Sequence, residues 1–478
     1  MIKIEKGMTI HLMGICGTAM ASLAGLLKEK GFKVTGSDSN PYPPMSTQLE
    51  KLGIHIMKGY KAENLSHNPD LVIVGNVISK NNLEAETLLQ SNIPYTSLPK
   101  AIGEWVIEDR DSIVISGTHG KTTTTSLMSW VAKECGIKPG FLVGGIPKNF
   151  SYSFAIPQGN FFIIEGDEYD TAFFDKVPKF VHYKPKHVIL TSVEFDHADI
   201  YENLDDVKSA FRKLISLIPE NGTLIYNQKD QNIKSILESF SPGELKVKKK
   251  FSYGIMKADY ISKLAVQDES GSTFQMFNGP IFLGEFFIPL HGEYNILNAT
   301  SVVAMAHVLD WNLEQVRMAL AGFLGIKRRQ EIIGEPNKIT IIEDFAHHPT
   351  AVLETVRAVQ NRFEGRKVFS VFEPRSATSR RKVFQKDYVN AFRGANEVIV
   401  AEAYDQVKIN DEDRFSSQEL VENLTSEKIL AHSFKNADAI VDYLVVTARP
   451  KDVILIMSNG AFDGIYSKLL QKLSQTVN

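Results

Sequence analysis

The stretch SIVISGTHGKTTTT, residues 112–125, decides how this chain folds. Its start, SIVIS, is an apolar run typical of a buried strand, a short loop lies between Gly117 and Gly120, and helical sequence begins near Thr122. A strand, a glycine loop and a helix in this order build a phosphate cradle, because backbone N–H groups and the helix N-terminus favour an anion. Lys121 would neutralise phosphate charge, and the Thr122 hydroxyl could bind Mg²⁺.

The loop departs from the general phosphate-loop pattern in its length. Two residues separate its glycines, where the general motif has four. A tight turn that carries a surface lysine is therefore the alternative interpretation of Lys121. We favour the cradle because the strand, the Gly-Lys-Thr sequence and the helix keep the order on which phosphate binding depends.

Two further apolar runs of the same unit end in acidic residues. They are FFIIEGDE at 161–168 and HVILTSVE at 187–194. Open α/β sheets bind ligands at the carboxyl ends of their strands, and Mg²⁺ on a nucleotide keeps oxygen ligands. The candidates for a metal site are therefore the polar residues at these ends: Glu165, Asp167, Glu168, Glu194, Asp196 and His197. One acidic strand end is usually only solvated, but two ends beside a phosphate loop favour a metal.

Alternating apolar strands and helices also occur on both sides of this unit, which indicates three domains. Before it, an apolar run ends at Gly14, a helical pattern covers residues 19–30, and another strand pattern covers residues 70–75. After it, the strand patterns are ITIIEDF, KVFSVFE, EVIVAEA and VILIMS. The sequence predicts an α/β protein with parallel sheets covered on both faces. The predicted domains are residues 1–108, 109–326 and 327–478.

Composition limits the class of protein. The chain has 478 residues, of which 43% are hydrophobic, and this is more than one core usually supports. A net charge of -3 argues against nonspecific binding to nucleic acids or anionic membranes. Cys16 and Cys135 give no sign of a disulfide framework. Charged residues interrupt the apolar start of the chain, so we expect no signal peptide, no membrane span and a cytoplasmic protein.

The first domain contains another glycine loop, GICGTAM at residues 14–20. A dinucleotide fingerprint reads G-x-G-x-x-G, whereas here two residues separate Gly14 from Gly17 and Met20 takes the last position. The helix after Gly17 could still hold a diphosphate, and Asp38 lies where an acidic residue could meet a ribose or a base. A nicotinamide dehydrogenase is therefore a weaker alternative, and a non-enzymatic ATP switch built on the central unit is another.

Five motifs occur in the order of a known enzyme family. They are GTHGKTTTT (117–125), EGDEYD (165–170), EFDHADIY (194–201), HGEYNILNA (291–299) and EDFAHHPT (343–350). The sequence resembles the Mur ligases over essentially its whole length. The resemblance implies an N-terminal Rossmann-like domain for a uridine nucleotide, a central P-loop-like ATPase domain, and a C-terminal Rossmann-like domain that closes over ATP and brings the amine. Neither alternative explains the motifs of the third domain.

The resemblance also implies an ATP-dependent amide ligase that forms an acyl phosphate and uses ATP with Mg²⁺ or Mn²⁺. The residues implied for ATP binding are Gly117, Thr118, His119, Gly120, Lys121, Thr122, Thr123, Asn295, Asn298, Arg328, Asp344 and His347. Thr122 and Glu165 are expected to bind the first metal and His197 the second. The residues implied for catalysis are Lys121, Glu165, His197, Asp344 and His348. A simple helix start is the alternative for the two histidines before Pro349.

For the acid substrate, the resemblance implies UDP-N-acetylmuramate. The residues implied for binding it are Gly14, Cys16, Gly17, Thr18, Met20, Ser37 and Asp38. The amine is either L-alanine or the cell-wall tripeptide L-alanyl-γ-D-glutamyl-meso-diaminopimelate. Alanine-adding members have DESDASF and P-H-R-Y, whereas this chain has DEYDTAFFDKVPKFVHY (167–183), FEPRSATSR (372–380) and SNGAFDGIY (458–466). These segments favour the tripeptide and a role in peptidoglycan recycling.

Arg375 and Arg380 are the predicted peptide-binding residues. An arginine fork matches a carboxylate in two parallel hydrogen bonds, and the tripeptide carries carboxylates. The alternative for Arg375 is an exposed arginine in a turn. We expect the protein to be a monomer or a weak homo-oligomer.

Overall fold

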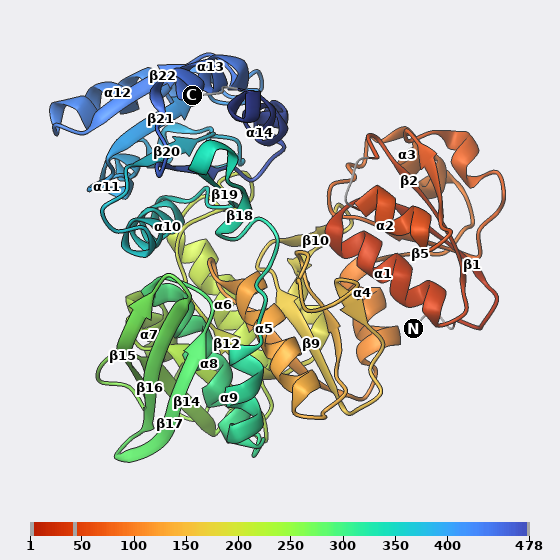
Figure 1. Cartoon of the computed structure of the whole chain (residues 1–478). Coiled ribbons are helices and arrows are strands. Elements are labelled where there is room, and N and C mark those ends of the chain that lie inside the picture. The colour runs from red at the N-terminus through yellow and green to blue at the C-terminus, as the bar shows by residue number, and fades with distance from the viewer. Residues whose placement is uncertain (1–3, 42–44, 476–478) are drawn as a thin grey trace.

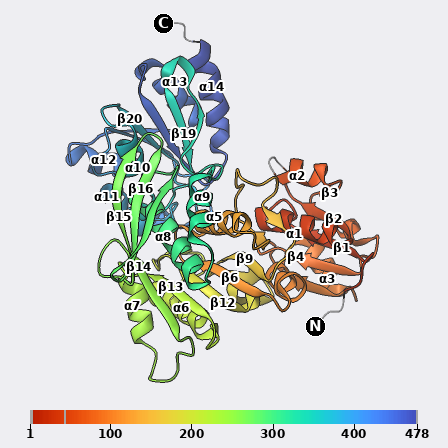
Figure 2. The ribbon, with the colours of Figure 1, turned by 60° about the horizontal axis from the view of Figure 1, so that its bottom comes forward.

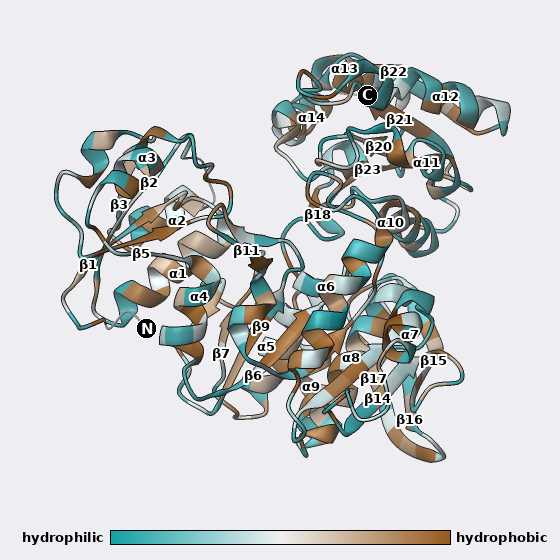
Figure 3. Cartoon of the chain, turned by 180° about the vertical axis from the view of Figure 1, so that it is seen from behind, coloured by the Kyte–Doolittle hydropathy of each residue, from teal (hydrophilic) through white to brown (hydrophobic). Residues whose placement is uncertain are grey.

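The computed structural model describes residues 4–41 and 45–475, which form three α/β domains (Figure 1). The N-terminal and C-terminal domains lie against different parts of the central domain (Figure 2). Hydrophobic residues concentrate on the strands of the sheets, and hydrophilic residues cover much of the outer helices (Figure 3). Within the described part of the chain, every helix is too short or too polar to cross a bilayer.

The N-terminal domain is a parallel five-stranded sheet with the order β3-β2-β1-β4-β5. The strands are β1 (Thr9–Met13), β2 (Lys33–Asp38), β3 (His55–Lys58), β4 (Leu71–Val74) and β5 (Tyr95–Ser97). The helices are α1 (Thr18–Glu29), α2 (Met45–Lys51), η1 (Ala62–Leu65), α3 (Leu83–Gln90), α4 (Leu98–Ile102) and η2 (Gly103–Ile107). Because β1 is central and leads into α1, the loop at residues 14–17 lies at the carboxyl edge of the sheet, where such folds bind ligands.

The central domain contains a ten-stranded sheet with the order β17-β16-β15-β14-β13-β12-β6-β9-β7-β8. Its strands are β6 (Asp111–Ser116), β7 (Gly140–Leu142), β8 (Phe154–Ala155), β9 (Phe161–Gly166), β12 (Pro185–Leu190), β13 (Thr223–Asn227), β14 (Lys249–Gly254), β15 (Tyr260–Asp268), β16 (Gly271–Asn278) and β17 (Ile281–Ile288). Its helices are α5 (Lys121–Glu134), η3 (Lys179–Tyr183), α6 (Leu204–Leu217), α7 (Gln231–Glu238), α8 (Glu293–Val308) and α9 (Leu313–Ala321). Strand β6 leads into the phosphate loop and lies between β9 and β12, so their carboxyl ends flank that loop.

Two parts of the central domain were not anticipated from the sequence. Strands β15, β16 and β17 extend the sheet in antiparallel order. A separate antiparallel hairpin consists of β10 (Asp170–Ala172) and β11 (Asp175–Pro178). The hairpin follows the acidic end of β9 and carries Phe173 at its turn, and this ring packs against a hydrophobic cluster of the N-terminal domain. It therefore links the phosphate loop region to the N-terminal domain.

The C-terminal domain is a six-stranded sheet with the order β18-β19-β23-β20-β21-β22. The strands are β18 (Glu331–Gly334), β19 (Thr340–Asp344), β20 (Val368–Phe372), β21 (Glu397–Ala401), β22 (Leu430–Phe434) and β23 (Val453–Met457). The helices are η4 (Pro336–Lys338), α10 (Pro349–Arg362), η5 (Lys382–Phe384), α11 (Asp387–Ala391), η6 (Asp411–Asp413), α12 (Ser417–Ser426), α13 (Ala437–Thr447), η7 (Phe462–Gly464) and α14 (Ile465–Gln475). Only β18 pairs antiparallel, and a hydrophobic cluster covers each face of the sheet.

The N-terminal and central domains share one hydrophobic cluster. Its buried members include Leu23 of α1, Trp105 of η2, and Phe180 and Phe211 of the central domain. At the contact, the Phe154 ring lies against Gly25 of α1 so closely that a side chain at this glycine would overlap it. The boundary between these two domains is therefore a packed interior, and the C-terminal domain keeps separate cores.

Candidate active site

The phosphate loop has the geometry that its sequence predicts. Gly117 and Gly120 have backbone φ angles of +133° and +81°, which residues other than glycine rarely adopt. A Cβ at Gly117 would lie 2.8 Å from the backbone of Ser192. Helix α5 begins at Lys121 after Gly120, and no side chain caps its N-terminus. The first N–H groups of α5 can therefore bind an anion.

Lys121 is paired with protein carboxylates in this structure. Its Nζ donates to Gly117 O at 2.5 Å and lies 3.1 Å from Glu168 Oε2 and 4.0 Å from Asp167 Oδ1. Burial alone would lower the pKa of Lys121, but the two carboxylates hold it above its usual value. The lysine stays charged, and a phosphate bound at this loop would have to compete with Glu168 for it.

Thr122 and Glu165 contact each other at the start of α5. The Thr122 hydroxyl donates to Glu165 Oε2 at 3.0 Å, and the Gly144 N–H donates to Glu165 Oε1 at 2.5 Å. Burial and the nearby Asp167 raise the pKa of Glu165, so a cation beside this carboxylate would favour its charged form. A half-buried carboxylate and a hydroxyl that both line the cavity fit Mg²⁺, which prefers oxygen ligands.

His197 lines the same cavity but lies beside other groups. Its Nε2 is 3.7 Å from Glu168 Oε1, and its ring centroid is 4.8 Å from that of Tyr169. Tyr169 contacts Lys179, a buried lysine that no sequence motif indicated as a site residue. The Lys179 Nζ lies 2.9 Å from both the Tyr169 hydroxyl and Asp167 Oδ2. Its only sequence signal was its place within the segment that differs from the alanine-adding members.

A cavity of about 530 Å³ joins the phosphate loop to the C-terminal domain. The predicted site residues that line it are Thr118, His119, Gly120, Lys121, Thr122, Thr123, Glu165, His197, Asn295, Asn298, Asp344 and His347. Asn298 approaches the loop so closely that its Oδ1 would lie 2.8 Å from a Cβ at Gly120. Apart from Gly117 and Arg328, the residues predicted for ATP binding line this one cavity.

Arg328, predicted to meet ATP, is not among the residues that line this cavity. Its Nε pairs with Glu343 at 2.6 Å, and its Nη2 donates to the carbonyls of Ser458 and Gly460 at 3.0 and 2.6 Å. These bonds hold the start of the C-terminal domain to its own sheet. The next residue, Arg329, lines the cavity. The sequence does not show which of two neighbouring arginines faces the cavity, because the direction of each side chain depends on tertiary contacts.

The motif EDFAHHPT brings C-terminal groups to the central domain. Asp344, at the end of β19, accepts hydrogen bonds from the N–H groups of Gln330 and Ala346 at 2.8 Å each, and burial raises its pKa.

The two histidines of the same motif face the central domain. The Nε2 atom of His347 lies 4.0 Å from Asp196 Oδ2. His348 caps the start of α10, and its Nε2 lies 3.1 Å from the carbonyl of Phe195. His348 is therefore both a helix start and a contact between domains.

Hydroxyl groups of the C-terminal domain complete this contact. Thr350 Oγ1 donates to Glu194 Oε2 at 2.6 Å, and Thr378 Oγ1 donates to Asp196 Oδ1 at 2.7 Å. Both carboxylates follow β12, next to the phosphate loop. The structure thus shows the two domains in direct contact over the cavity.

The predicted uridine loop keeps the expected backbone shape. Gly14 has φ +81°, and its N–H donates to Ser37 O at 2.8 Å. The Cys16 N–H donates to Asp38 Oδ2 at 3.0 Å, and α1 starts at Thr18 after Gly17 without a side-chain cap. The loop and the start of α1 can therefore receive a diphosphate.

Two predicted members of this site point into the domain instead. Met20 is buried under the loop, and the Ser37 hydroxyl donates to Glu84 Oε1 at 2.9 Å. Glu84 is fully buried and also bonds His11 Nε2 at 2.8 Å and Asn64 Nδ2 at 2.7 Å. In this structure their side chains support the loop from inside the domain. Glu84 lies on helix α3, and no local sequence pattern indicates its buried role.

The two predicted peptide arginines lie outside the cavity lining. Arg375 stacks over the Tyr404 ring at 3.7 Å and pairs with Glu373 at 3.2 Å. Arg380 donates to the carbonyls of Asp405 and Ser376 at 2.6 and 3.3 Å. Arg380 therefore stabilises its own loop, whereas the side chain of Arg375 is 23% exposed.

Comparison with known proteins agrees with this arrangement. Three family descriptions match in order: Mur ligase family, catalytic domain (residues 9–110), Mur ligase middle domain (115–306) and Mur ligase, glutamate ligase domain (328–460). The chain belongs to the Mur ligase family of ATP-dependent ligases.

Relatives match along the full length of the chain. The UDP-N-acetylmuramate--L-alanyl-gamma-D-glutamyl-meso-2,6-diaminoheptandioate ligase of Escherichia coli (strain K12) is 38% identical over 98% of this chain and 99% of that protein. A UDP-N-acetylmuramate--L-alanine ligase of Clostridium tetani is 32% identical over 94% and 95%. The crystal structure of a murein peptide ligase from Psychrobacter arcticus has a TM-score of 0.74 at 33% identity and covers 99% of this chain and 100% of that one.

Proposed function

We propose that this protein joins UDP-N-acetylmuramate to the tripeptide L-alanyl-γ-D-glutamyl-meso-diaminopimelate in an ATP-dependent reaction of peptidoglycan recycling. The full-length similarity to the ligase of Escherichia coli that bears this activity in its name carries the proposal. The segment 167–183 differs from the alanine-adding pattern and supports the same substrate. It contains the hairpin β10-β11, which lies between the central and N-terminal domains.

The chemistry requires the acid to be activated. An amine cannot expel oxide from a carboxylate, so the lactyl carboxylate attacks the γ-phosphorus of ATP, which gives an acyl phosphate and releases ADP. The peptide amine attacks this carbonyl, and phosphate leaves from the tetrahedral intermediate. Lys121 and the N-terminus of α5 stabilise charge on the transferred phosphoryl group, and the domains supply positioning.

Each domain contributes one part of the proposed site. Thr122 and Glu165 would hold Mg²⁺, which neutralises phosphate charge when it is bound, and His197 is proposed for a second ion. Arg329 and Asp344 are proposed to meet the nucleotide from the C-terminal domain. The loop at residues 14–18 is proposed to bind the uridine diphosphate, and Arg375 a carboxylate of the peptide.

The proposed domain limits are residues 1–108, 109–326 and 327–478. The separate sheets and the three matched family regions support these limits. We also propose that the reaction takes place in the cytoplasm, where ATP and the uridine nucleotide are available.

The test is a product analysis by mass spectrometry. Enzyme, ATP, Mg²⁺ and UDP-N-acetylmuramate are incubated with the tripeptide or with L-alanine in parallel reactions. We expect the tripeptide adduct to form far faster than the alanine adduct. Preference for L-alanine would replace the recycling assignment with an alanine-adding one, and the absence of product with both amines would contradict the ligase activity itself.

A further inference from the structure

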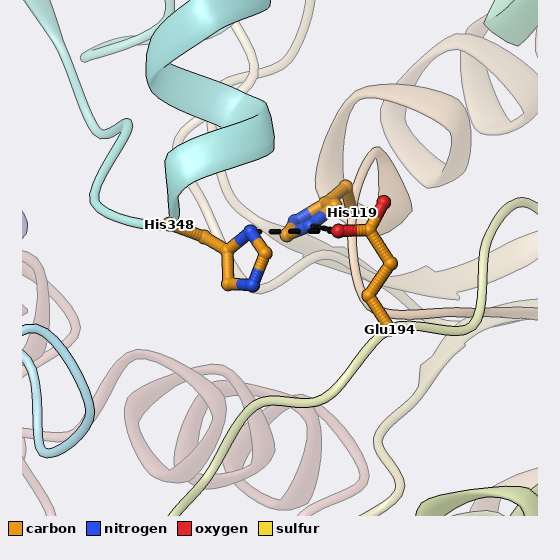
Figure 4. Close-up of side chains that lie close together, drawn as sticks. All are labelled: His119, Glu194 and His348. Carbon is orange, nitrogen blue, oxygen red and sulfur yellow. Dashed lines mark ion pairs between the residues drawn. The ribbon is translucent and has the colours of Figure 1, made fainter. Parts of the chain in front are cut away.

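Three potential metal ligands meet where the C-terminal domain contacts the phosphate loop (Figure 4). They are His119 of the loop, Glu194 after β12, and His348 at the start of α10. One ligand atom from each lies within 4.8 Å of the other two. Two of these side chains belong to the central domain and one to the C-terminal domain, so the group is complete only while the domains are in contact.

The hydrogen bonds around these side chains leave ring nitrogens facing a carboxylate. The neighbour of His348 Nε2 at 3.1 Å is the carbonyl oxygen of Phe195, so Nε2 carries the proton of the neutral ring. The other ring nitrogen, Nδ1, then has no proton and acts as an acceptor. That Nδ1 lies 3.6 Å from Glu194 Oε2, and the Thr350 N–H reaches it only at 3.3 Å. His119 Nε2, 3.5 Å from the same carboxylate oxygen, is buried and finds no hydrogen-bond partner among the described residues.

Two ring nitrogens that share one carboxylate oxygen are stabilised by a proton or a cation between them. A buried polar atom without a partner is costly, and a lone pair that faces a carboxylate is repelled by it. A proton could relieve one of the two contacts, whereas a metal ion would relieve both. The observed separations of 3.5 and 3.6 Å are close to the separation of about 3.4 Å between ligands of a tetrahedral ion with bonds of about 2.0–2.1 Å.

The ligand types distinguish this group from the magnesium site. Two imidazoles and one carboxylate suit Zn²⁺, often with an open fourth position, whereas Mg²⁺ prefers oxygen ligands only. The strand order β12-β6-β9 also separates the two places. Glu165 lies at the end of β9 on one side of the phosphate loop, and Glu194 follows β12 on the other.

We propose that His119, Glu194 and His348 form a binding site for a transition-metal ion of the Zn²⁺ type, separate from the magnesium site and assembled by contact between the central and C-terminal domains. A bound ion connects the two domains directly. It therefore favours the closed arrangement of the enzyme over the open one.

Binding of Co²⁺ to the full chain, without nucleotide, tests the proposal. Co²⁺ replaces Zn²⁺ in such sites and absorbs visible light strongly when its coordination is tetrahedral. We expect about one Co²⁺ per chain with this absorption, retained in excess Mg²⁺ and displaced by Zn²⁺. The absorption should be lost in Glu194→Gln and in His348→Gln, which keeps a side-chain oxygen to cap α10.

The matched controls are His347→Ala and Glu165→Gln. His347 is adjacent in sequence to His348 but is not one of the three proposed metal ligands. Glu165 belongs to the proposed magnesium site. Both variants should therefore keep the Co²⁺ absorption. Thermal unfolding confirms that each variant is folded, and a variant that fails this check is replaced by His119→Gln. Absence of tetrahedral Co²⁺ in the wild type, or an unchanged spectrum in the ligand variants, would overturn the proposal.

Discussion

At the residue scale, Lys121 shows how carboxylates keep a largely buried ammonium group charged. Its ammonium group lies beside Glu168 and Asp167, and Asp167 also accepts a hydrogen bond from Lys179. In the proposed function, phosphate oxygens would replace these carboxylates as partners of Lys121.

Replacing Lys121 should separate the two substrate sites. In Lys121→Ala we expect almost complete loss of ligation, because the charge on the transferred phosphoryl group loses its partner. Binding of UDP-N-acetylmuramate, measured by calorimetric titration, should stay close to that of the wild type, because its proposed site lies in another domain. Loss of uridine-nucleotide binding with retained ATP binding would contradict the domain assignment.

Arg375 provides a test of peptide recognition. If its guanidinium meets a peptide carboxylate, Arg375→Ala removes a hydrogen bond to a charged group that contributes about 2–3 kcal/mol. The efficiency kcat/KM for the tripeptide should then fall roughly 30- to 150-fold, with little change in ATP binding. Arg375→Lys should rescue only part of the loss, because lysine lacks the planar fork.

The pairing of Arg375 with Glu373 supplies the control for this prediction. A purely structural role would lower the melting temperature of Arg375→Ala and change turnover with every amine alike. A loss of efficiency that is equal for the tripeptide and for L-alanine would therefore argue against a peptide contact.

At the element scale, the sequence predicted those strands, loops and helices that follow from a local residue pattern. The strand, loop and helix at residues 112–134 and the acidic ends of β9 and β12 are local features, and the structure contains them. Strand β15 was missed because most of its middle is exposed, which gives no buried-strand pattern. The direction of Arg328 and the buried contacts of Glu84 and Lys179 were also missed, because they depend on residues distant in sequence.

Strand β12 should make the protein sensitive to mild acid. Burial of His187 on this strand lowers its pKa from 6.5 to about 4. The unfolded chain therefore binds a proton between these pH values and the folded chain does not, so stability falls as pH decreases from 6.5 to 4. The full effect is about 3 kcal/mol for one histidine.

The comparison for this prediction is His187→Leu, which keeps an apolar side chain beside Phe161. Urea unfolding, followed by tryptophan fluorescence at pH 7 and pH 5, should show a smaller loss of stability for the variant than for the wild type. An equal loss in both proteins would mean that other groups cause the acid sensitivity.

At the scale of the whole molecule, the proposed reaction requires groups from separate domains to meet. Contacts such as Thr378 to Asp196 form only while the C-terminal domain lies on the central domain. Substrates that bind between domains favour this arrangement. We expect small-angle scattering to show a smaller radius of gyration with saturating ATP analogue and UDP-N-acetylmuramate than without ligands. An unchanged radius would argue against a required large closure.

The cluster shared by the N-terminal and central domains has a consequence for how the molecule melts. Elements that share one interior lose their packing together, whereas the C-terminal domain has interiors of its own. Three domains should therefore behave as two cooperative units. Differential scanning calorimetry is expected to resolve two heat-absorption peaks, and Phe154→Ala, which removes the ring against Gly25, should broaden the one that includes the N-terminal domain. Three well-separated peaks in the wild type would show that the shared interior does not couple the first two domains.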